Sequence, residues 1–389
     1  MKIAAVICEF NPFHNGHKYL LDEIKRQGYE CIICVMSSSF TQRGEVAILS
    51  KFERTKAALE NGADLVIELP VPYAVSSAQR FAKGAADIIK ATGVVDKVIF
   101  GSECGDIHLI RKAANATLDE AVRAILKEKM NSGEYYPNAL ESAVRKICGQ
   151  KIADVLASPN NTLGVEYVKE LMGSGIDTDT VKRIAVEHDS STSKDEFASA
   201  SLIREMILNA EDVSAFMPDC EISNPAFMEF GERAVIFKLK SMTAEDFEKL
   251  PDVSEGLHNR IYSAVQNCSS LNELLMEIKT KRYTLARLRR IITYALLDIT
   301  KDIQNSALPY LRILGMTDKG KAVLSDIAKH SALPIVTSLA PALRNLDEKA
   351  REMLMCEVKA TDLRTVFEKN ISESSRDFTT AVLKTKDNR

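Results

Sequence analysis

The chain has 389 residues, enough for two or three domains, with two the better expectation. Hydrophobic residues make up 46% and charged residues 27%, which fits an ordinary core and a soluble surface, and no apolar run is long enough to span a membrane. The net charge of −3 excludes a global attraction to nucleic acid, so any RNA contact needs a local basic patch.

The first eight residues are apolar but run straight into Glu9 without a small-residue cleavage site. We therefore interpret them as a buried strand and not as a signal peptide. A cytoplasmic protein without a membrane partner is predicted, and no sequence feature indicates a protein partner.

The first hundred residues alternate between strand and helix patterns. Apolar strands are predicted at residues 2–8, 31–36, 65–69 and 97–100, and helices at residues 17–26, 51–61 and 77–92. Such alternation predicts a Rossmann-like α/β fold, in which helices cover both faces of a parallel sheet. Ligands bind such sheets beyond the carboxyl ends of the strands. The polar clusters of this half fall there, at residues 9–17, 37–45 and 101–103.

Farther along the chain, the pattern is less regular. We predict a helix at residues 109–130, an asparagine cap at 160–161 for a helix over 163–172, a short strand at 182–187 and a helix at 199–209. After residue 210 the pattern is almost wholly helical. The sequence therefore predicts an α/β domain over residues 1–210 and an all-helical domain over residues 211–389.

Eight cysteines occur, and Cys31 and Cys34 form a CxxC pair inside an apolar strand. A zinc site needs a second pair of ligands, and none stands at metal spacing. We interpret both as core cysteines of a reduced protein, and we predict no metal site built from side chains.

The first polar cluster, residues 9–17, reads Glu-Phe-Asn-Pro-Phe-His-Asn-Gly-His and lies between a strand and a helix. His14 and His17 are three residues apart, so both can face the helix N-terminus, and Gly16 allows a ligand to approach the backbone. Free N–H groups and the helix dipole attract phosphate there. Imidazole N–H donors can stabilise the charge on a phosphate undergoing displacement. The motif predicts nucleotidyl or phosphoryl transfer, whereas a lone histidine would be a surface or capping residue.

A second polar segment, Ser199-Ala200-Ser201-Leu202-Ile203-Arg204, opens a later helix. Hydroxyls and N–H groups at a helix start, together with Arg204, can hold the β- and γ-phosphates of a nucleotide. Ser-Ala-Ser before a helix is also a routine cap. The segment indicates phosphate binding only together with the His-x-Gly-His (HxGH) motif that precedes it in the chain.

These two motifs resemble the signatures of the nucleotidyltransferases related to class I aminoacyl-tRNA synthetases, with Ala200 replacing one hydroxyl of the ISSTxxR pattern. Further segments narrow the resemblance to the tRNA(Met) cytidine acetate ligase family, from residue 1 to at least residue 315. They are residues 35–45, 50–54, 64–70, 100–103, 158–164 and 281–284. Ser38 and Ser39 depart from the usual glycine and asparagine or histidine of that family, and leave the core Gln42-Arg43-Gly44 intact.

The resemblance implies that ATP and acetate form acetyl-adenylate, and that the acetyl group passes to N4 of the wobble cytidine, position 34, of elongator tRNA(Met). ATP is expected over His14, Gly16 and His17, with its triphosphate reaching towards Arg204 and Mg²⁺ held mainly by phosphate oxygens and water. The expected catalytic residues are His14, His17, Arg43 and Arg204. The other expected ATP contacts are Ile7, Cys8, Glu9, Phe10, Asn11, Pro12, Phe13, Gly101, Asn160, Asn161, Arg183, Ile184, Ser199 and Ser201.

A carboxylate can approach the α-phosphate of ATP only if cations offset the like charge. Arg43, Lys51 and Arg54 follow the second strand and are candidates. Arg43 stands between Gln42 and Gly44 and is hard to interpret otherwise, whereas Lys51 and Arg54 fit a solvated helix face equally well.

Two positions near strand ends have alternative interpretations. Gly101 gives adenine or ribose access to the backbone, and Arg183 can stack on adenine or simply belong to an edge strand. Asn160 and Asn161 can contact a base edge or a ribose, although one of them fits a helix cap.

The helical half contains a basic stretch without one acid: Lys279, Lys281, Arg282, Arg287, Arg289 and Arg290, with Tyr283 among them. Arg287 and Arg290 share a helix face. Basic residues interleaved with an aromatic fit an RNA backbone, although a charge run is otherwise a solvated helix face. With the resemblance, we assign Lys281, Arg282, Arg287 and Arg290 to tRNA contact and expect Arg287 and Arg290 to be exposed.

Two other functions are compatible with an HxGH site. The first is a small-molecule adenylyl- or cytidylyltransferase acting on a phosphate monoester, which would not need the extra helical half. The second is a non-catalytic tRNA-binding protein that senses ATP, which would not need both histidines and Arg204. Incubation with ATP and acetate, with and without tRNA, separates the three.

Overall fold

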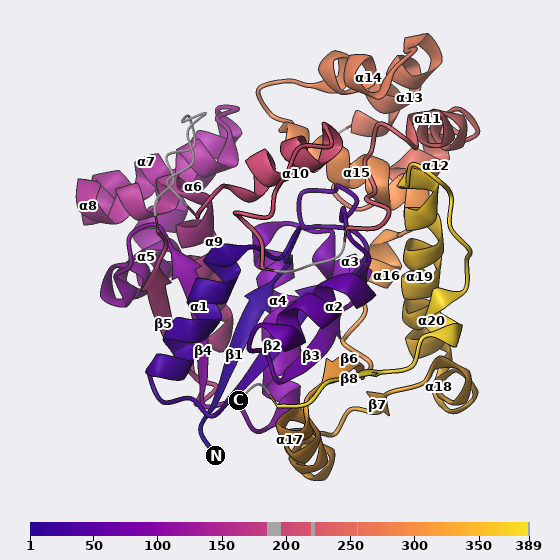
Figure 1. Cartoon of the computed structure of the whole chain (residues 1–389). Coiled ribbons are helices and arrows are strands. Elements are labelled where there is room, and N and C mark those ends of the chain that lie inside the picture. The colour runs from indigo at the N-terminus through magenta and orange to yellow at the C-terminus, as the bar shows by residue number, and fades with distance from the viewer. Residues whose placement is uncertain (185–195, 219–221, 255, 388–389) are drawn as a thin grey trace.

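A computed structural model describes residues 1–184, 196–218, 222–254 and 256–387. Within these ranges the centre is an eight-stranded sheet of order β5-β4-β1-β2-β3-β6-β7, with β8 paired to β6 (Figure 1). The strands are β1 (Ile3–Cys8), β2 (Cys31–Ser37), β3 (Leu65–Leu69), β4 (Lys97–Ser102), β5 (Asp177–Lys182), β6 (Leu311–Met316), β7 (Ile335–Val336) and β8 (Leu383–Lys384). β1 to β5 run parallel, and β6 pairs antiparallel with β3.

The strand order changes direction at β1. The chain passes from β1 to β2 and β3 on one side and then crosses to β4 on the other side. The segments that follow β1 and β4 therefore diverge, and a crevice opens between them, which is where doubly wound sheets bind ligands. This arrangement confirms the predicted parallel α/β fold.

Both faces of the sheet are covered by helices. They include α1 (Asn15–Arg26), α2 (Lys51–Glu60), α4 (Ala78–Thr92) and α9 (Pro159–Leu171). Because alternate residues of a strand point to opposite faces, Ala5 and Ile7 pack in the core under α4 and α9, whereas Val6 and Cys8 pack under α1 and α2. Figure 1 shows α1 and α2 in front of the sheet and α4 behind it.

The CxxC cysteines follow the same alternation. Cys31 belongs to the core cluster under α4 and Cys34 to the cluster under α1, and both are buried free thiols. The interpretation as core cysteines is confirmed, because side chains on opposite faces of one strand cannot bind the same ion.

The middle of the chain differs from the prediction in two places. The helix expected over residues 109–130 is two helices, because Asp119 ends the first and its carboxylate accepts hydrogen bonds from the N–H groups of Ala121 and Val122. The strand β5 covers Asp177–Lys182, where Asp177 pairs with Lys97 of β4, and thus begins before the strand expected at 182–187. Residues 185–187 of that expected strand lie outside the described residues. The remaining helices here are α3 (Val71–Ala74), α5 (Ile107–Leu118), α6 (Glu120–Asn131), α7 (Tyr136–Cys148), α8 (Gln150–Ala153), the 3₁₀ turn Asp154–Ala157 and α10 (Ala200–Leu208).

The second half of the chain is mainly helical, as predicted. Its helices are α11 (Glu232–Lys240), α12 (Ala244–Glu248), α13 (Leu257–Asn267), α14 (Leu271–Ile278), α15 (Leu285–Leu297), α16 (Lys301–Asn305), α17 (Asp318–His330), α18 (Leu339–Asn345), α19 (Glu348–Arg364), the 3₁₀ turn Thr365–Phe367 and α20 (Arg376–Thr379). It is not wholly helical, however, because β6, β7 and β8 extend the sheet beyond β3. The domain boundary at residue 210 stays a prediction. In the parts of the chain that are described, no helix is both long and apolar enough to cross a bilayer.

Buried ion pairs between α2, β3, β6 and α20 join the two halves of the chain. Lys51 Nζ lies 2.7 Å from Glu68 Oε1 and 2.8 Å from Asp377 Oδ1. Arg312 on β6 contacts the same two carboxylates, and Lys51 is fully buried. Arg54 is also fully buried, and its guanidinium donates to backbone carbonyls, among them that of Glu9. Both earlier interpretations of Lys51 and Arg54 are therefore wrong, since neither lies on a solvated face or in the cleft described below.

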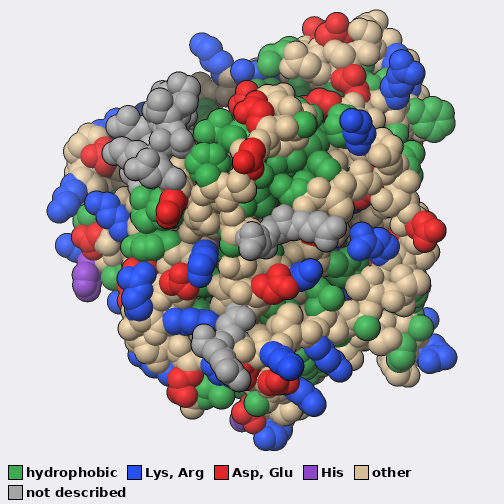
Figure 2. Space-filling view, in the orientation of Figure 1, with side chains coloured by type: hydrophobic (Ala, Val, Ile, Leu, Met, Phe, Trp, Pro, Cys, Tyr) green, Lys and Arg blue, Asp and Glu red, His purple; other side chains and the backbone are tan. Residues whose placement is uncertain are grey.

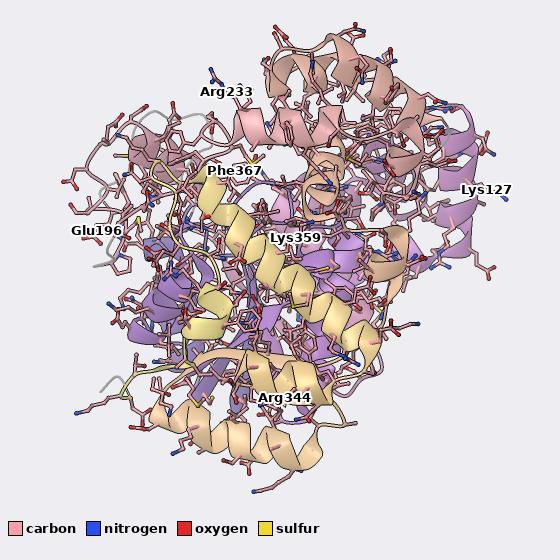
Figure 3. The ribbon with its side chains drawn as sticks, turned by 90° about the vertical axis from the view of Figure 1, so that its right-hand side faces the viewer. Lys127, Glu196, Arg233, Arg344, Lys359 and Phe367 are labelled. Atoms are coloured by element: carbon pink, nitrogen blue, oxygen red, sulfur yellow. The ribbon has the colours of Figure 1, made fainter. Side chains whose placement is uncertain are left out.

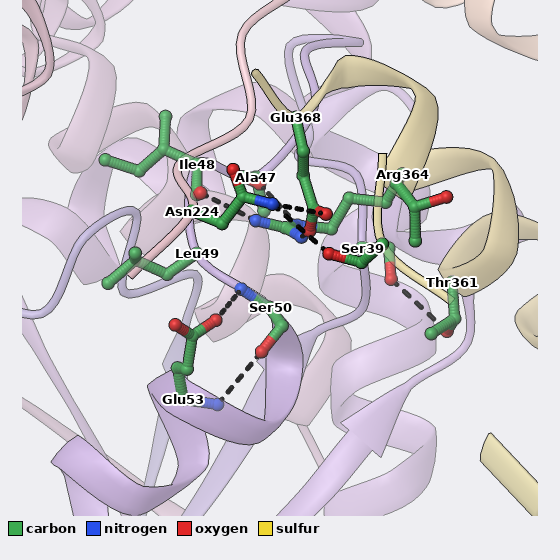
Figure 4. A network of polar contacts seen from close by, with 12 residues as sticks. Ser39, Ala47, Ile48, Leu49, Ser50, Glu53, Asn224, Thr361, Arg364 and Glu368 are labelled. Atoms are coloured by element: carbon green, nitrogen blue, oxygen red, sulfur yellow. Dashed lines mark hydrogen bonds and ion pairs between the residues drawn. The ribbon is translucent and has the colours of Figure 1, made fainter. Parts of the chain in front are cut away.

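Helix α19 holds the loop between β2 and α2. Arg364 Nε donates to Ala47 O at 2.9 Å and Arg364 Nη2 to Ile48 O at 2.7 Å, and Glu368 pairs with the same guanidinium (Figure 4). Figure 3 shows α19 lying diagonally across this side of the molecule, with Phe367 at its upper end. The loop that follows β2 is thus fixed by the far end of the sequence.

Candidate active site

A cavity of about 1090 Å³ opens at the carboxyl ends of β1 and β4, between the sheet and the helical half. In the orientation of Figure 1, Figure 2 shows hydrophobic side chains gathered in the upper middle of the face, with acidic and basic side chains mixed over its lower half. The predicted site residues that line the cavity are Ile7, Cys8, Glu9, Phe10, Asn11, His14, Gly16, His17, Arg43, Gly101, Asn160, Arg183, Ile184, Ser199, Ser201, Arg204, Arg282, Arg287 and Arg290. Pro12, Phe13, Asn161 and Lys281 lie outside this lining.

The two histidines are held by the start of α1. His14 is the N-cap, and its Nδ1 accepts a hydrogen bond from Gly16 N at 3.0 Å. His17 Nδ1 accepts from His14 N at 3.3 Å, and the two rings stack with centroids 3.8 Å apart. Because Nδ1 is an acceptor in both rings, the neutral imidazoles carry their protons on Nε2.

Burial keeps both imidazoles neutral. It lowers the pKa of His14 to about 3, helped by the positive charges of Arg183 and Arg204. Burial, His14 and Arg183 likewise hold the pKa of His17 well below its ordinary value. The pair therefore offers N–H donors and no formal charge, which suits stabilisation of a phosphate that becomes more negative.

Gly16 leaves room for the imidazole of His14, and it also lines the cavity. A Cβ atom at Gly16 would lie 2.8 Å from His14 Cε1, which is closer than carbon atoms tolerate. The glycine thus lets the imidazole fold back over the first turn of α1. The sequence prediction gave Gly16 a different reason.

Arg204 lies beside the histidines. Its Nη1 donates to Asn11 O at 2.9 Å and its Nη2 to Ser201 Oγ at 3.1 Å, while Ser199 Oγ caps α10 by accepting from Leu202 N. Burial lowers the pKa of Arg204 somewhat, although Glu45 and Glu9 oppose the shift. The Ser-rich segment and the HxGH segment are therefore in direct contact, although far apart in sequence.

The loop after β2 forms another wall. Gln42 N donates to Glu9 Oε1 at 2.7 Å, and Gln42 Nε2 donates to Ser76 O at 2.8 Å. Burial raises the pKa of Glu9, while this hydrogen bond and the charges of nearby arginines oppose the rise. Arg43 is exposed to the cavity and makes no hydrogen bond or ion pair to any residue that the structure describes. Its guanidinium is thus available to an anion.

The asparagines lock β4 to α9. Asn161 Oδ1 accepts from Glu103 N at 3.0 Å, and Glu103 Oε2 accepts from Asn161 N at 2.9 Å. Asn160 Nδ2 donates to Glu103 Oε1 at 2.6 Å. Neither asparagine caps α9, whose N-cap is Ser158. Glu103 belongs to the polar cluster predicted at residues 101–103, but it was given no role of its own.

Gly101 and Arg183 lie at the carboxyl ends of β4 and β5 and line the cavity. A Cβ atom at Gly101 would lie 3.3 Å from Arg183 Cγ, so the arginine covers this backbone. Arg183 and Ile184 follow β5 and are exposed to the cavity. His188 and Asp189, a polar pair that follows the strand predicted at 182–187 and was given no role, lie outside the described residues. Asn15 was given no role of its own: its Nδ2 donates to Glu196 O and Ala215 O, which anchors the segments before and after α10.

The basic helix α15 faces the same cavity. Arg290 Nε lies 3.1 Å from Asp252 Oδ2, and Arg287 Nε donates to Asp252 O at 3.0 Å. Arg290 is buried and Arg287 half-buried, so the expectation that both are exposed is wrong. Lys281 and Arg282 are the exposed members, and Arg282 Nη2 would lie 3.8 Å from a Cβ at Gly133, in the α6–α7 turn.

The parallel sheet with its crevice at β1 and β4, the two histidines at the start of α1 and the neighbouring Arg204 define an α/β protein of the HxGH nucleotidyltransferase class. The family model described as HIGH Nucleotidyl Transferase matches residues 1–378. Within this class the chain belongs to the tRNA(Met) cytidine acetate ligase family, and it is an enzyme of the ligase type.

Relatives and solved structures match along almost the whole chain. A tRNA(Met) cytidine acetate ligase of Acetivibrio thermocellus is 38% identical over 98% of this chain and 100% of its own length. Another, from a Thermoanaerobacter species, is 39% identical over 99% of this chain and 100% of its own. The crystal structure of Thermotoga maritima TmcAL bound with alpha-thio ATP superimposes with a TM-score of 0.91, at 31% identity over 99% of this chain and 100% of that chain.

Proposed function

We propose that this chain activates acetate with ATP and transfers the acetyl group to N4 of the wobble cytidine, position 34, of elongator tRNA(Met). In the first step an acetate oxygen forms a bond to the α-phosphorus of ATP, the bond to the bridging oxygen breaks, and pyrophosphate leaves. In the second step N4 attacks the acetyl carbon, AMP leaves, and N4 loses a proton. The activation is needed because the lone pair of the amine is delocalised into the cytosine ring.

The histidine pair supports the first step. The Nε2–H groups of His14 and His17 donate to the phosphate on which charge grows, and Arg204 contacts the β- and γ-phosphates. Arg43 offsets the repulsion between the acetate carboxylate and the α-phosphate. Mg²⁺ accompanies the triphosphate, held mainly by phosphate oxygens and water. Among the described residues no three His, Cys, Asp or Glu side chains gather as ligands of one ion.

The single observation that carries the proposal is the lining of one cavity by both sets of residues. The HxGH histidines, Arg204 and the basic residues Arg282, Arg287 and Arg290 all border it. A nucleotide of a bound tRNA must reach the adenylate for transfer, and this arrangement brings the basic surface to the nucleotide site. The names of the relatives and the bound ATP analogue in the Thermotoga maritima structure support the same substrates.

The test is an incubation with ATP and radiolabelled acetate, with and without tRNA(Met). The proposal expects AMP and pyrophosphate as products, acetylated RNA only when tRNA is present, and no need for acetyl-CoA. Formation of ADP, or an absolute requirement for acetyl-CoA, would contradict it. Adenylyl transfer to a phosphate monoester would indicate a small-molecule transferase, and tRNA binding without turnover would indicate an ATP-sensing protein.

A further inference from the structure

The N-terminus of α4 opens into the cavity with free donors. Ser77 Oγ caps the helix by accepting from Arg80 N, and Ser77, Ala78 and Gln79 line the cavity. The backbone N–H groups of Ala78 and Gln79 have no acceptor among the described residues. A helix of this length presents partial positive charge at such an end, which favours an anion.

A buried tyrosine provides a second, independent donor. Tyr167 on α9 is 4% exposed, and it lines the same cavity. Its hydroxyl makes no hydrogen bond to any residue in the described parts of the chain, although tyrosine hydroxyls inside proteins normally have a partner. Burial, and then the neighbouring Glu9 and Cys8, raise the pKa of Tyr167, so the hydroxyl is a neutral donor close to the end of β1.

Aromatic rings complete this recess. Phe100 packs edge-on against Tyr167 with centroids 5.5 Å apart, and Phe81, in the first turns of α4, lines the cavity beside them. Phe81 and Phe100 are almost fully buried and therefore present a rigid apolar wall. The acidic neighbour, Glu9, already accepts from Gln42 N, and Arg54, Arg43 and Arg204 oppose its charge.

We propose that this recess is the subsite for the acyl donor: the Tyr167 hydroxyl and the N–H groups of Ala78 and Gln79 bind the carboxylate of a short-chain acid, and Phe81 and Phe100 contact its methyl group. The inference rests on the proposed function, whose histidines and arginines are assigned to the nucleotide. Donors from two helices, α4 and α9, hold the carboxylate, and the aromatic wall limits the length of the alkyl chain. The subsite therefore selects acetate over longer acids.

Tyr167→Phe tests the hydroxyl and keeps the ring that packs on Phe100. The assay is acetate-dependent ATP–pyrophosphate exchange by the full chain without tRNA. The KM for acetate is expected to rise about tenfold to a hundredfold, the effect of one hydrogen bond to a charged group, while the KM for ATP stays within about twofold. Tyr310→Phe is the matched control, because the buried hydroxyl of Tyr310 has no hydrogen-bond partner among the described residues and Tyr310 lies outside the cavity lining. In Tyr310→Phe the KM for acetate and the KM for ATP are expected to stay unchanged.

Ala78→Pro removes the other kind of donor. Proline is tolerated at the first position of a helix, and Ser77 already has the extended conformation that a following proline requires. This variant is also expected to raise the KM for acetate about tenfold or less. Phe81→Leu is expected to raise the rate with propionate relative to acetate by widening the recess. A melting curve of each variant checks that it is folded.

The outcomes separate the subsite from the reaction. An unchanged KM for acetate in both Tyr167→Phe and Ala78→Pro overturns the subsite, and so does an equal rise of the KM for ATP, which would assign the recess to the nucleotide. Binding of acetate is followed in parallel by saturation-transfer NMR of its methyl group. If the wild type binds acetate, Tyr167→Phe does not, and no exchange occurs, the subsite stands and the proposed reaction falls.

Discussion

A Cβ atom at Gly44 would lie only 2.5 Å from the backbone nitrogen of Arg290, so the loop after β2 and helix α15 touch backbone to backbone. Thr293 Oγ1 donates to Gly44 O at 2.9 Å, and Arg289 Nη1 lies 3.0 Å from Glu45 Oε1. The loop that carries Arg43 is therefore positioned by the helical half, and the nucleotide site and the basic helix are mechanically joined.

Gly44→Ala is expected to lower the free energy of unfolding by about 1–3 kcal/mol, because alanine is strained at φ +75° and its methyl group would overlap Arg290. Exchange of pyrophosphate into ATP should fall as Arg43 is displaced. Denaturant unfolding and the exchange assay measure the two effects. Gly173→Ala is the control, since Gly173 has the same φ and nothing within 4 Å. Equal losses in both variants would mean that backbone strain alone matters.

The local part of the site could be predicted from the sequence. His14 and His17 lie within one strand–turn–helix unit, so their spacing and the following helix are enough to bring them together. The same holds for the cap at Ser199. The contact between Arg204 and Asn11 was not predicted, since the order of the two motifs and the family resemblance indicated only that ATP would reach both segments.

The long-range part could not be predicted. The partner of Lys51, Asp377, lies near the other end of the chain, and nothing in the local pattern around Lys51 distinguishes a buried ion pair from a solvated helix face. The sequence around Arg290 predicts an exposed side chain, because its partner Asp252 lies far away in the sequence. The apolar run of β6 was missed because a short apolar segment within helical sequence gives no periodicity of its own.

His17→Asn should raise the activation free energy of the reaction by about 2–4 kcal/mol and lower kcat accordingly, as for loss of one positioned donor. The asparagine oxygen can still accept from His14 N, so the start of α1 is kept while the Nε2–H donor is lost. ATP affinity, measured by calorimetry, should change much less than kcat. Wild-type turnover in this variant would remove His17 from the mechanism.

The pH dependence of stability follows from the lowered pKa of His14, about 3 against an ordinary value of 6.5. Above pH 6.5 the imidazole is neutral in the folded and the unfolded chain. As the pH falls from 6.5 towards 3, only the unfolded chain takes up the proton, so stability is lost by at most about 1.4 kcal/mol per pH unit. Denaturant unfolding between pH 7 and 5 measures the slope, which should be shallower in His14→Asn. Identical slopes would mean that His14 is protonated in the folded chain.

Lys51→Met should lower the free energy of unfolding by about 3–5 kcal/mol, because Glu68 and Asp377 would then share a single buried counter-charge, Arg312, among the residues that the structure describes. Lys56→Met, an exposed change on the same helix, is the control and should change stability by less than about 0.5 kcal/mol. The molecules that remain folded should still form adenylate at a low temperature. If Lys51→Met has normal stability but forms no adenylate, Lys51 acts in the nucleotide site and not in the buried ion pairs.

Lys281→Ala combined with Arg282→Ala tests the tRNA surface better than changes at Arg287 and Arg290, which are tied to Asp252. If both contact RNA phosphates, tRNA binding weakens and the log–log salt slope flattens by up to about 0.7–0.9 per lost contact. Exchange of pyrophosphate without tRNA should persist, because neither residue belongs to the proposed nucleotide contacts.

Lys321→Ala with Lys349→Ala removes the same charge from exposed positions outside the cavity lining and serves as the control. Filter binding at several salt concentrations gives both slopes. Equal weakening by the two double variants would indicate an effect of net charge only, and an unchanged slope in the first would move the tRNA surface elsewhere on the protein.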